Sequence, residues 1–420
     1  MEEVASAASL SRSEARFENA NTGGSLAWYK VRVSPRVWSA FALIFCALFL
    51  AWHARRYLPF MADDAFISLR YSQRLIEGKG LTWDSSEHVE GYSNLTWVLA
   101  CAVLGALGTD WVLAARIVGA VSSFALLAAI AYAFRPGRGG GFWCATAAML
   151  SVAVCTPIAV WAQGGLEQPL VAALLAWSFA LTLYRGDPAR VSLRAPALLL
   201  ALLTLSRPDG VFLAALFSAG VGVSRGLHWA QLRRGAVLFT GAGIASLLQL
   251  AFRWFYYHDW VPNPARIKVS FTPERLKEGL EYLNQALLFL SPAGIAILAA
   301  VTALSARAEA RIRALPIGML ALCWAAYVAF IGGDIFPGRR HVVVLIVAAA
   351  FALGELLFWM KRELSGRAPV FGIALAFVLV QATIQINDPE AKAAQEEKWE
   401  WDGEVVGRLL KQAFARQSPL

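Results

Sequence analysis

Long apolar blocks that few charged residues interrupt are the feature that most constrains this sequence. The blocks at 111–134, 236–257 and 341–360 are each as long as the helix of about 20 residues that crosses the hydrocarbon core of a bilayer. Of the 420 residues, 58% are hydrophobic and 16% are charged, whereas about a quarter of a soluble domain is charged. This composition excludes a soluble enzyme, a disordered chain and a disulfide-stapled secreted module. It predicts an all-α, polytopic membrane protein.

The apolar blocks divide the chain into a tail, a membrane domain and a short end. We expect about eleven transmembrane helices within 37–386, after a disordered cytoplasmic tail at 1–36. The tail is too polar for a cleavable signal peptide, and a segment at 387–420 follows the last span. The expected spans are 37–53, 111–134, 142–160, 168–184, 195–205, 210–223, 236–257, 284–304, 314–331, 341–360 and 369–386.

The charges between the spans predict the orientation. In every second connection the charged residues are mainly Arg and Lys, as in cytoplasmic loops. These connections are 135–141, 185–194, 224–234, 305–313 and 361–367. The opposite connections at 54–110, 161–167, 206–209, 258–283 and 332–340 hold both signs and are assigned to the outer face. The apolar stretch 95–108 would invert this pattern if it crossed the membrane. We therefore expect a helix lying at the outer interface there.

The cysteines indicate neither disulfides nor a metal site. Cys46, Cys101, Cys144, Cys155 and Cys323 all lie in apolar stretches without a CxxC pair or metal-type spacing. They are interpreted as small core residues.

The first outer loop, 54–110, holds the strongest candidates for chemistry. Asp63 and Asp64 come directly before a run at 65–77 with amphipathic helical spacing that includes Arg70. One Asp could simply cap this helix. Two adjacent carboxylates at the mouth of a bilayer repel each other, however, which favours a functional role for at least one.

Other polar groups share the predicted outer face. Within 90–97, Glu90, Tyr92 and Asn94 form either a turn before an aromatic interface anchor or a wall that faces a sugar. The remaining candidates are Glu167, Arg207 in the break between two short spans, Asn263 with Lys268, and Asp334 with Arg339 and Arg340. Turn residues and snorkelling arginines explain each group alone equally well. Their convergence on one face favours a site.

In this order, the outer stretches resemble one membrane family. The runs 63–71, 77–81 and 89–97, followed by 164–167, 206–210, 261–263 with Lys268, and 332–340, are similar to bacterial GT-C glycosyltransferases. The closest likeness is to those related to the mycobacterial terminal arabinofuranosyltransferase. The resemblance covers about 55–345, and its first-loop pattern is the most specific part. Relatives commonly continue into an outer soluble domain, so 387–420 resembles a truncated periplasmic domain.

The resemblance implies an enzyme of the bacterial inner membrane that acts on its periplasmic face. Such an enzyme moves a sugar, in this family a pentofuranose in some members, from a polyprenyl-phosphate donor in the bilayer to a cell-envelope glycan, lipid or protein. In the family an acidic residue of the first outer loop is central to catalysis, here Asp63 or Asp64.

The residue types agree with this chemistry. Transfer from a polyprenyl phosphate expels a phosphate, so the acceptor hydroxyl needs a base and the leaving phosphate needs cations. We expect a carboxylate of Asp63 or Asp64 to be the base. The phosphate candidates are Arg207, Lys268, Arg339 and Arg340, and the sugar or acceptor candidates are Arg70, Glu90, Tyr92, Asn94, Glu167, Asn263 and Asp334. The sequence requires no cofactor, although Mg²⁺ or Mn²⁺ is compatible with such oxygens.

Three alternatives fit less well. A transporter or flippase of polyprenyl-linked glycans would also have a basic, aromatic cavity, but it should show repeated halves, and the sequence has no internal repeat. A structural scaffold does not explain paired carboxylates beside outer arginines. Nucleic-acid binding is not expected, because the net charge of +9 comes from the predicted cytoplasmic loops.

Overall fold

A computed structural model describes residues 34–85, 88–136, 142–186, 190–263, 272–363 and 368–414, with backbone alone at 288–300, 302, 368 and 369. The described residues from Pro35 onward form one compact unit. These described ranges are helical and contain no strand, which confirms the all-α prediction. The predicted tail at 1–36 lies almost wholly outside them.

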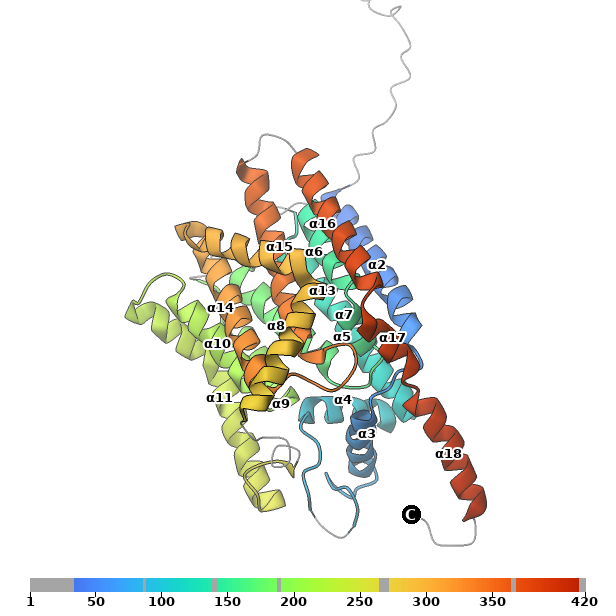
Figure 1. Cartoon of the computed structure of the whole chain (residues 1–420). Helices are drawn as coiled ribbons and strands as arrows, with labels where there is room; N and C mark the ends of the chain where they lie inside the picture. The colour runs from blue at the N-terminus through green and yellow to red at the C-terminus, as the bar shows by residue number, and fades with distance from the viewer. Residues whose placement is uncertain are drawn as a thin grey trace, which may run out of the picture. The chain divides into compact units, whose positions relative to one another are not determined.

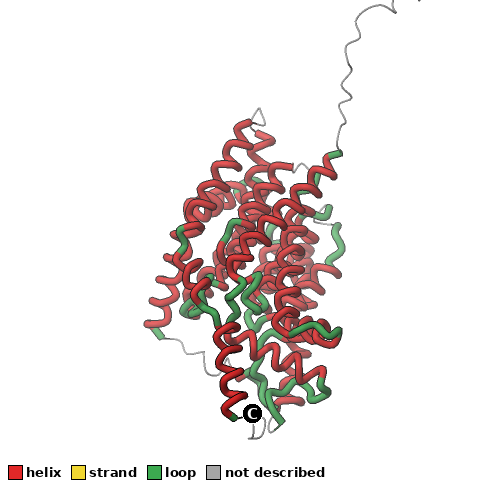
Figure 2. Tube along the Cα trace, turned by 90° about the vertical axis from the view of Figure 1, so that its right-hand side faces the viewer, coloured by secondary structure: helices red, strands yellow, loops and turns green. Residues whose placement is uncertain are grey.

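Helices of different lengths follow one another along the chain, joined by loops (Figures 1 and 2). They are α2 Pro35–Ala54, α3 Asp63–Ile76, α4 Leu95–Ala106, α5 Trp111–Ala133, α6 Phe142–Ala153, α7 Thr156–Trp161, α8 Gln168–Leu183, α9 Arg194–Ser206, α10 Gly210–Val223, α11 Trp229–Tyr257, α13 Pro273–Ser305, α14 Ala308–Ile331, α15 Val343–Glu363, α16 Ala368–Ile386, α17 Pro389–Glu396 and α18 Trp399–Ala413. Short 3-10 turns at Arg55–Tyr57 (η2) and Arg340–Val342 (η3) complete the described elements.

The chain is a multi-pass membrane protein. Five described helices, α2, α5, α11, α14 and η3–α15, are long and apolar enough to cross a membrane. A sixth span results if α16 and the bent segment after it count as one, and α4, α6, α8, α9 and α10 are apolar but shorter. Every expected span coincides with a helix or helix pair, but the number of about eleven crossings stays a prediction.

Two boundaries differ from the sequence-based expectation. The block 142–160 is two helices, α6 and α7, because Pro157 stands in the first turn of α7 and lacks the N–H that a continuous helix needs. The helix expected at 65–77 begins at Asp63, so both carboxylates lie in its first turn. Negative charge is favourable there because it faces the positive end of the helix dipole.

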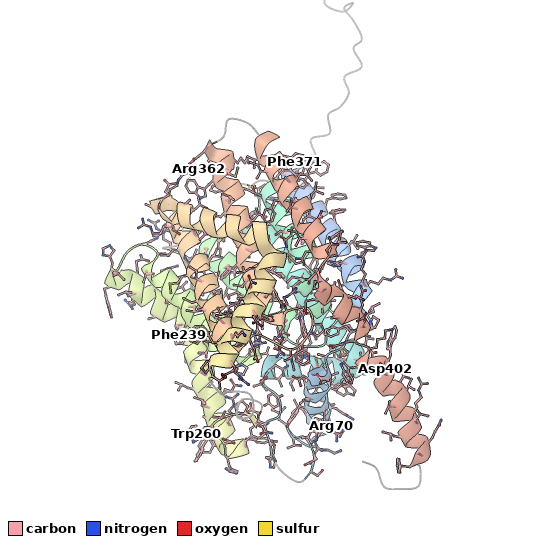
Figure 3. The ribbon with its side chains drawn as sticks, in the orientation of Figure 1. Arg70, Phe239, Trp260, Arg362, Phe371 and Asp402 are labelled. Carbon is pink, nitrogen blue, oxygen red and sulfur yellow. The ribbon has the colours of Figure 1, made fainter. Side chains whose placement is uncertain are left out.

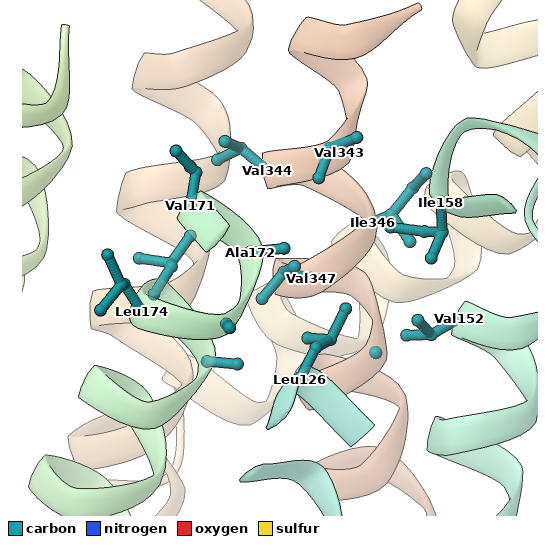
Figure 4. Close-up of a cluster of buried hydrophobic side chains, with 14 of the residues drawn as sticks. Leu126, Val152, Ile158, Val171, Ala172, Leu174, Val343, Val344, Ile346 and Val347 are labelled. Atoms are coloured by element: carbon teal, nitrogen blue, oxygen red, sulfur yellow. The ribbon is translucent and has the colours of Figure 1, made fainter. Parts of the chain in front are cut away.

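Small and branched residues of α5, α6, α7, α8 and α15 form the central part of the core. In the most apolar window of η3–α15, 78% of the residues are buried, against 22% for α11, so α15 runs through the interior and α11 along the outside. Figure 4 shows the core side chains of Leu126, Val152, Ile158, Val171, Ala172, Leu174, Val343, Val344, Ile346 and Val347.

The candidate residues that the structure describes gather at one end of the helical unit. In Figure 1, α3 and α4 lie at the lower end, with the beginning of α13 and the end of α11 beside them. α3 packs on α4 and contacts α5. This arrangement brings the connections after α2, α7, α9 and α14 together.

Candidate functional site

The first turn of α3 packs directly against the loop between α7 and α8. The Ala62 N–H donates to the Gly164 carbonyl at 3.1 Å, which fixes the point where α3 begins. Gly165 has a φ of +76°, and a Cβ there would lie 2.5 Å from Met61 Cε and 2.9 Å from Ala65 Cβ. Only glycine allows this approach. The Gly-Gly pair therefore positions the two carboxylates that follow.

Asp63 and Asp64 differ in their surroundings. Asp63 is exposed and its Oδ1 accepts the Asp64 N–H at 2.7 Å, whereas Asp64 is half-buried. The Asp63 charge also reaches Glu397 in the turn between α17 and α18. Burial chiefly raises the pKa of the Glu397 carboxyl, a hydrogen bond with Trp399 opposes the rise, and the negative charge of Asp63 adds a smaller upward contribution. A carboxylate of the C-terminal segment thus lies near the start of α3.

A buried chain of polar side chains leads from α3 to the break between α9 and α10. Ser68 Oγ donates to Asn94 Oδ1 at 3.0 Å, and Asn94 Nδ2 donates to Glu167 Oε2 at 2.8 Å. Glu167 Oε1 accepts from Arg207 Nη1 at 3.0 Å. Arg207 also donates from Nε and Nη2 to the two oxygens of Asp209, both at 2.7 Å. Three stretches that are far apart in sequence thus meet in one network.

The electrostatics of this network keep Asp209 ionised. Burial opposes the charged form of Asp209, but the adjacent Arg207 guanidinium and its hydrogen bonds hold the pKa of that carboxyl below its usual value. Tyr327 of α14 donates to Asp209 Oδ2 at 3.5 Å. Arg207 is therefore a fixed cation held between two carboxylates.

The loop between α14 and η3 adds a second pair next to the first. Arg340 Nε lies 2.7 Å from Asp334 Oδ2, and the guanidinium carbon stands 4.7 Å from the centre of the Phe336 ring. Burial raises the pKa of Asp334, and the charges of Arg340 and Arg207 oppose the rise. Both arginines therefore act on one carboxyl, which brings the α9–α10 break and the α14–η3 loop into one neighbourhood.

Arg339 faces the C-terminal segment. Its Nη1 donates to both oxygens of Asp388 at 2.7 and 2.8 Å, its Nη2 lies 3.8 Å from Glu390, and its side chain is 4% exposed. The adjoining Gly338 N–H donates to Glu390 at 3.0 Å. These contacts dock α17 onto the loop, and a role of Arg339 in phosphate binding stays a prediction.

The rest of the first outer loop packs on the end of α11. Glu90 pairs with Arg253 at 2.7 Å, with both side chains almost buried, and the Glu90 carbonyl accepts the Asn263 N–H at 3.1 Å. Burial raises the pKa of Glu90, and Arg253 opposes the rise. Tyr92 is buried beside Tyr257, whose Oη lies 3.4 Å from the Tyr92 Oη. Glu90, Tyr92 and Asn263 thus belong to this contact, apart from the Arg207 network.

Arg70 lies on the same side of α3 as Asp63, since the two residues are separated by seven positions, or about two helical turns. Its Nε donates to the Trp83 carbonyl at 3.3 Å. Figure 3 shows Arg70 at the same end of the unit as Trp260, which follows α11. Lys268 lies outside the described residues.

Sequence reasoning did not select Asp209, Arg253, Asp388 or Glu397. Asp209 stood in the Ser-Arg-Pro-Asp-Gly break that was already recognised. A signal for Arg253 existed as well, because an ionisable residue inside an apolar span is costly unless it is paired. Asp388 carried no signal, because its partner Arg339 comes from a distant part of the chain, and Glu397 carried none either. In the described part of the chain, no group of three His, Cys, Asp or Glu residues is placed to hold a metal ion.

Comparisons with known proteins identify the fold. No description of a known protein family matches the sequence, and no curated protein matches it. Among solved structures, the chain is similar to ArnT from Cupriavidus metallidurans bound to undecaprenyl phosphate, with a TM-score of 0.54 and 15% identity over 91% of this chain and 80% of that one. The apo ArnT structure gives a TM-score of 0.50 and 16% identity over 83% and 72% of the respective chains.

ArnT is a GT-C glycosyltransferase, so the fold predicted from the sequence resemblance is confirmed. At such low identity the likeness is one of fold.

Proposed function

We propose that this protein is a membrane glycosyltransferase that takes its sugar from a polyprenyl-phosphate donor. The observation that carries the proposal is a buried hydrogen-bonded network that joins α3, the helix of Asp63 and Asp64, to Arg207. The fold that holds this network is similar to that of a structure bound to undecaprenyl phosphate. A base and a phosphate-binding cation are the two groups that this reaction needs.

In the proposed reaction, an acceptor hydroxyl oxygen attacks the anomeric carbon of the donor sugar. The bond between that carbon and the phosphate oxygen breaks, and its electron pair stays on the phosphate. The hydroxyl proton passes to the carboxylate of Asp63 or Asp64. The leaving group is already anionic, so the step needs no general acid.

Arg207 and Arg340 are the proposed phosphate-binding residues. Asp209 and Glu167 take three of the five N–H groups of the Arg207 guanidinium, so the others remain for a phosphate oxygen. A preorganised guanidinium stabilises developing charge without having to reorient during the reaction. Lys268 and Arg339 remain further candidates from the sequence.

Arg70 is the proposed acceptor contact. It lies about 10 Å along α3 from Asp63, at 1.5 Å of helical rise per residue, a separation that an extended acceptor can span. The acceptor is proposed to be a cell-envelope glycan, lipid or protein on the outer face of the inner membrane. Glu90, Tyr92, Asn263 and Asp334 are proposed to shape the walls of the sugar and acceptor site.

The test uses purified protein in detergent with a panel of undecaprenyl-phosphate sugars that includes pentofuranoses and hexoses. We expect at least one donor to release undecaprenyl phosphate when an acceptor fraction of bacterial envelope is added. Transport of an intact donor across proteoliposomes, with no release of undecaprenyl phosphate by any donor, would instead support a flippase and refute the enzyme. Addition of EDTA tests whether Mg²⁺ or Mn²⁺ takes part.

A further inference from the structure

A network of side-chain hydrogen bonds, almost completely buried, leads from Ser68 through Asn94 and Glu167 to Arg207. Ser68 and Asn94 are each 3% exposed and Glu167 is 5% exposed. Buried polar groups that are fully bonded fix the orientation of one another, because any rotation leaves a donor or acceptor unpaired at high cost. These side-chain hydrogen bonds therefore connect α3 with the α9–α10 break.

Asn94 takes part in this hydrogen-bonded network instead of capping α4. It occupies the N-cap position of α4, where an Asn side chain normally accepts an N–H of the first helical turn. Here its side chain makes no capping bond. The two ends of its amide bind Ser68 and Glu167 instead. A carboxamide suits this place because it accepts at one end and donates at the other.

Glu167 is held just as completely. Its Oε2 accepts from Asn94, and its Oε1 accepts from Arg207 and from Gln168 Nε2 at 3.1 Å. Glu167 and Asp209 accept hydrogen bonds from different nitrogens of the Arg207 guanidinium, so together they fix the direction of its remaining N–H groups.

We propose that Asn94 and Glu167 are positioning residues, which act on the donor phosphate through Arg207 and tie its guanidinium to the helix of Asp63 and Asp64. This inference rests on the proposed function. It gives both residues a task different from direct contact with the sugar. It also makes Ser68, at the far end of the chain, a contributor to donor binding.

Two serines of α3 provide a matched test. Ser68 and Ser72 are both buried and one turn apart, but Ser72 Oγ donates to backbone carbonyls only, at 2.9 Å to Ser68 and 2.9 Å to Val98. The binding of undecaprenyl phosphate is measured by native mass spectrometry for Ser68→Ala and Ser72→Ala, with the melting temperature of each. We expect about fivefold weaker binding for Ser68→Ala and wild-type binding for Ser72→Ala, at similar losses of stability. Equal binding by the two variants would overturn the inference.

A double-mutant cycle tests whether the effect passes through Arg207. Asn94→Asp sets a second carboxylate against Glu167, and we expect on the order of tenfold weaker binding of undecaprenyl phosphate. In an Arg207→Ala background the same change should have no further effect. An equal loss in both backgrounds would refute the positioning role alone. Wild-type binding by Arg207→Ala would refute the phosphate role in the proposed function, and this inference with it.

Discussion

Replacing Gly165 by Ala should displace the start of α3 and with it the proposed catalytic carboxylates. The φ of +76° costs an L-residue about 1–2 kcal/mol. The added Cβ would lie 2.5 Å from Met61 Cε and 2.9 Å from Ala65 Cβ. The methionine end can move, but the Ala65 Cβ moves only with the helix, so overpacking adds about 1–3 kcal/mol. We therefore expect a total loss of about 2–5 kcal/mol.

Gly78 provides the control, because it follows the other end of α3 with nearly the same φ of +72° and nothing within 4 Å of an added Cβ. Gly78→Ala should lose about 1–2 kcal/mol and keep its activity. For Gly165→Ala, a shift of about 1 Å in the first turn should lower turnover on the order of 100-fold. Melting temperature and release of undecaprenyl phosphate are measured for both variants. Equal stability and equal turnover would refute the reasoning that the Gly-Gly loop positions α3.

Three further predictions concern the ion pairs. Asp388→Ala leaves Arg339 buried without its main partner, so thermal unfolding in detergent should show a loss of about 3–5 kcal/mol; a loss below about 1 kcal/mol would place the pair among weak surface contacts. Because the pKa of Asp209 is lowered in the folded protein, its ionised carboxylate stabilises the fold. This contribution is complete above the unfolded pKa of about 3.9 and is lost as the pH falls through the folded pKa. Asp209→Asn should therefore flatten the acid side of the stability profile, and an unchanged profile would contradict this. Arg253→Met leaves Glu90 unpaired, so limited proteolysis should cut the first outer loop faster than in wild type, whereas an unchanged rate would show that the pair does not hold the loop.

The sequence predicted the helical architecture because long apolar blocks carry a direct signal of helical spans, whereas the orientation that the charged connections indicate stays a prediction. It also selected Asn94, Glu167 and Arg207 as site candidates, and the structure joins them in one hydrogen-bonded network. It did not predict that they bind one another, since hydrogen-bond partners from separate loops depend on how the helices pack. The division of 142–160 into α6 and α7 could have been predicted from Pro157, because proline lacks the N–H for a continuous helix.

Contacts between distant loops could not be predicted from the sequence. The pairing of Arg339 with Asp388 joins two loops through the docking of α17, which no local pattern encodes. Residue type alone indicated that a cation could bind phosphate, but only the geometry shows which carboxylates hold each arginine, namely Glu167 and Asp209 for Arg207 and Asp388 for Arg339.

The most direct test of the central claim is the turnover of Asp63→Asn and Asp64→Asn with the donor that wild-type protein uses. Each change keeps the size of the side chain and removes the basic carboxylate. Because general base catalysis contributes about 10²–10⁴-fold, we predict that at least one variant loses turnover on that scale while its melting temperature and its binding of undecaprenyl phosphate stay near wild type. Wild-type turnover in both variants would contradict the proposed role of these carboxylates.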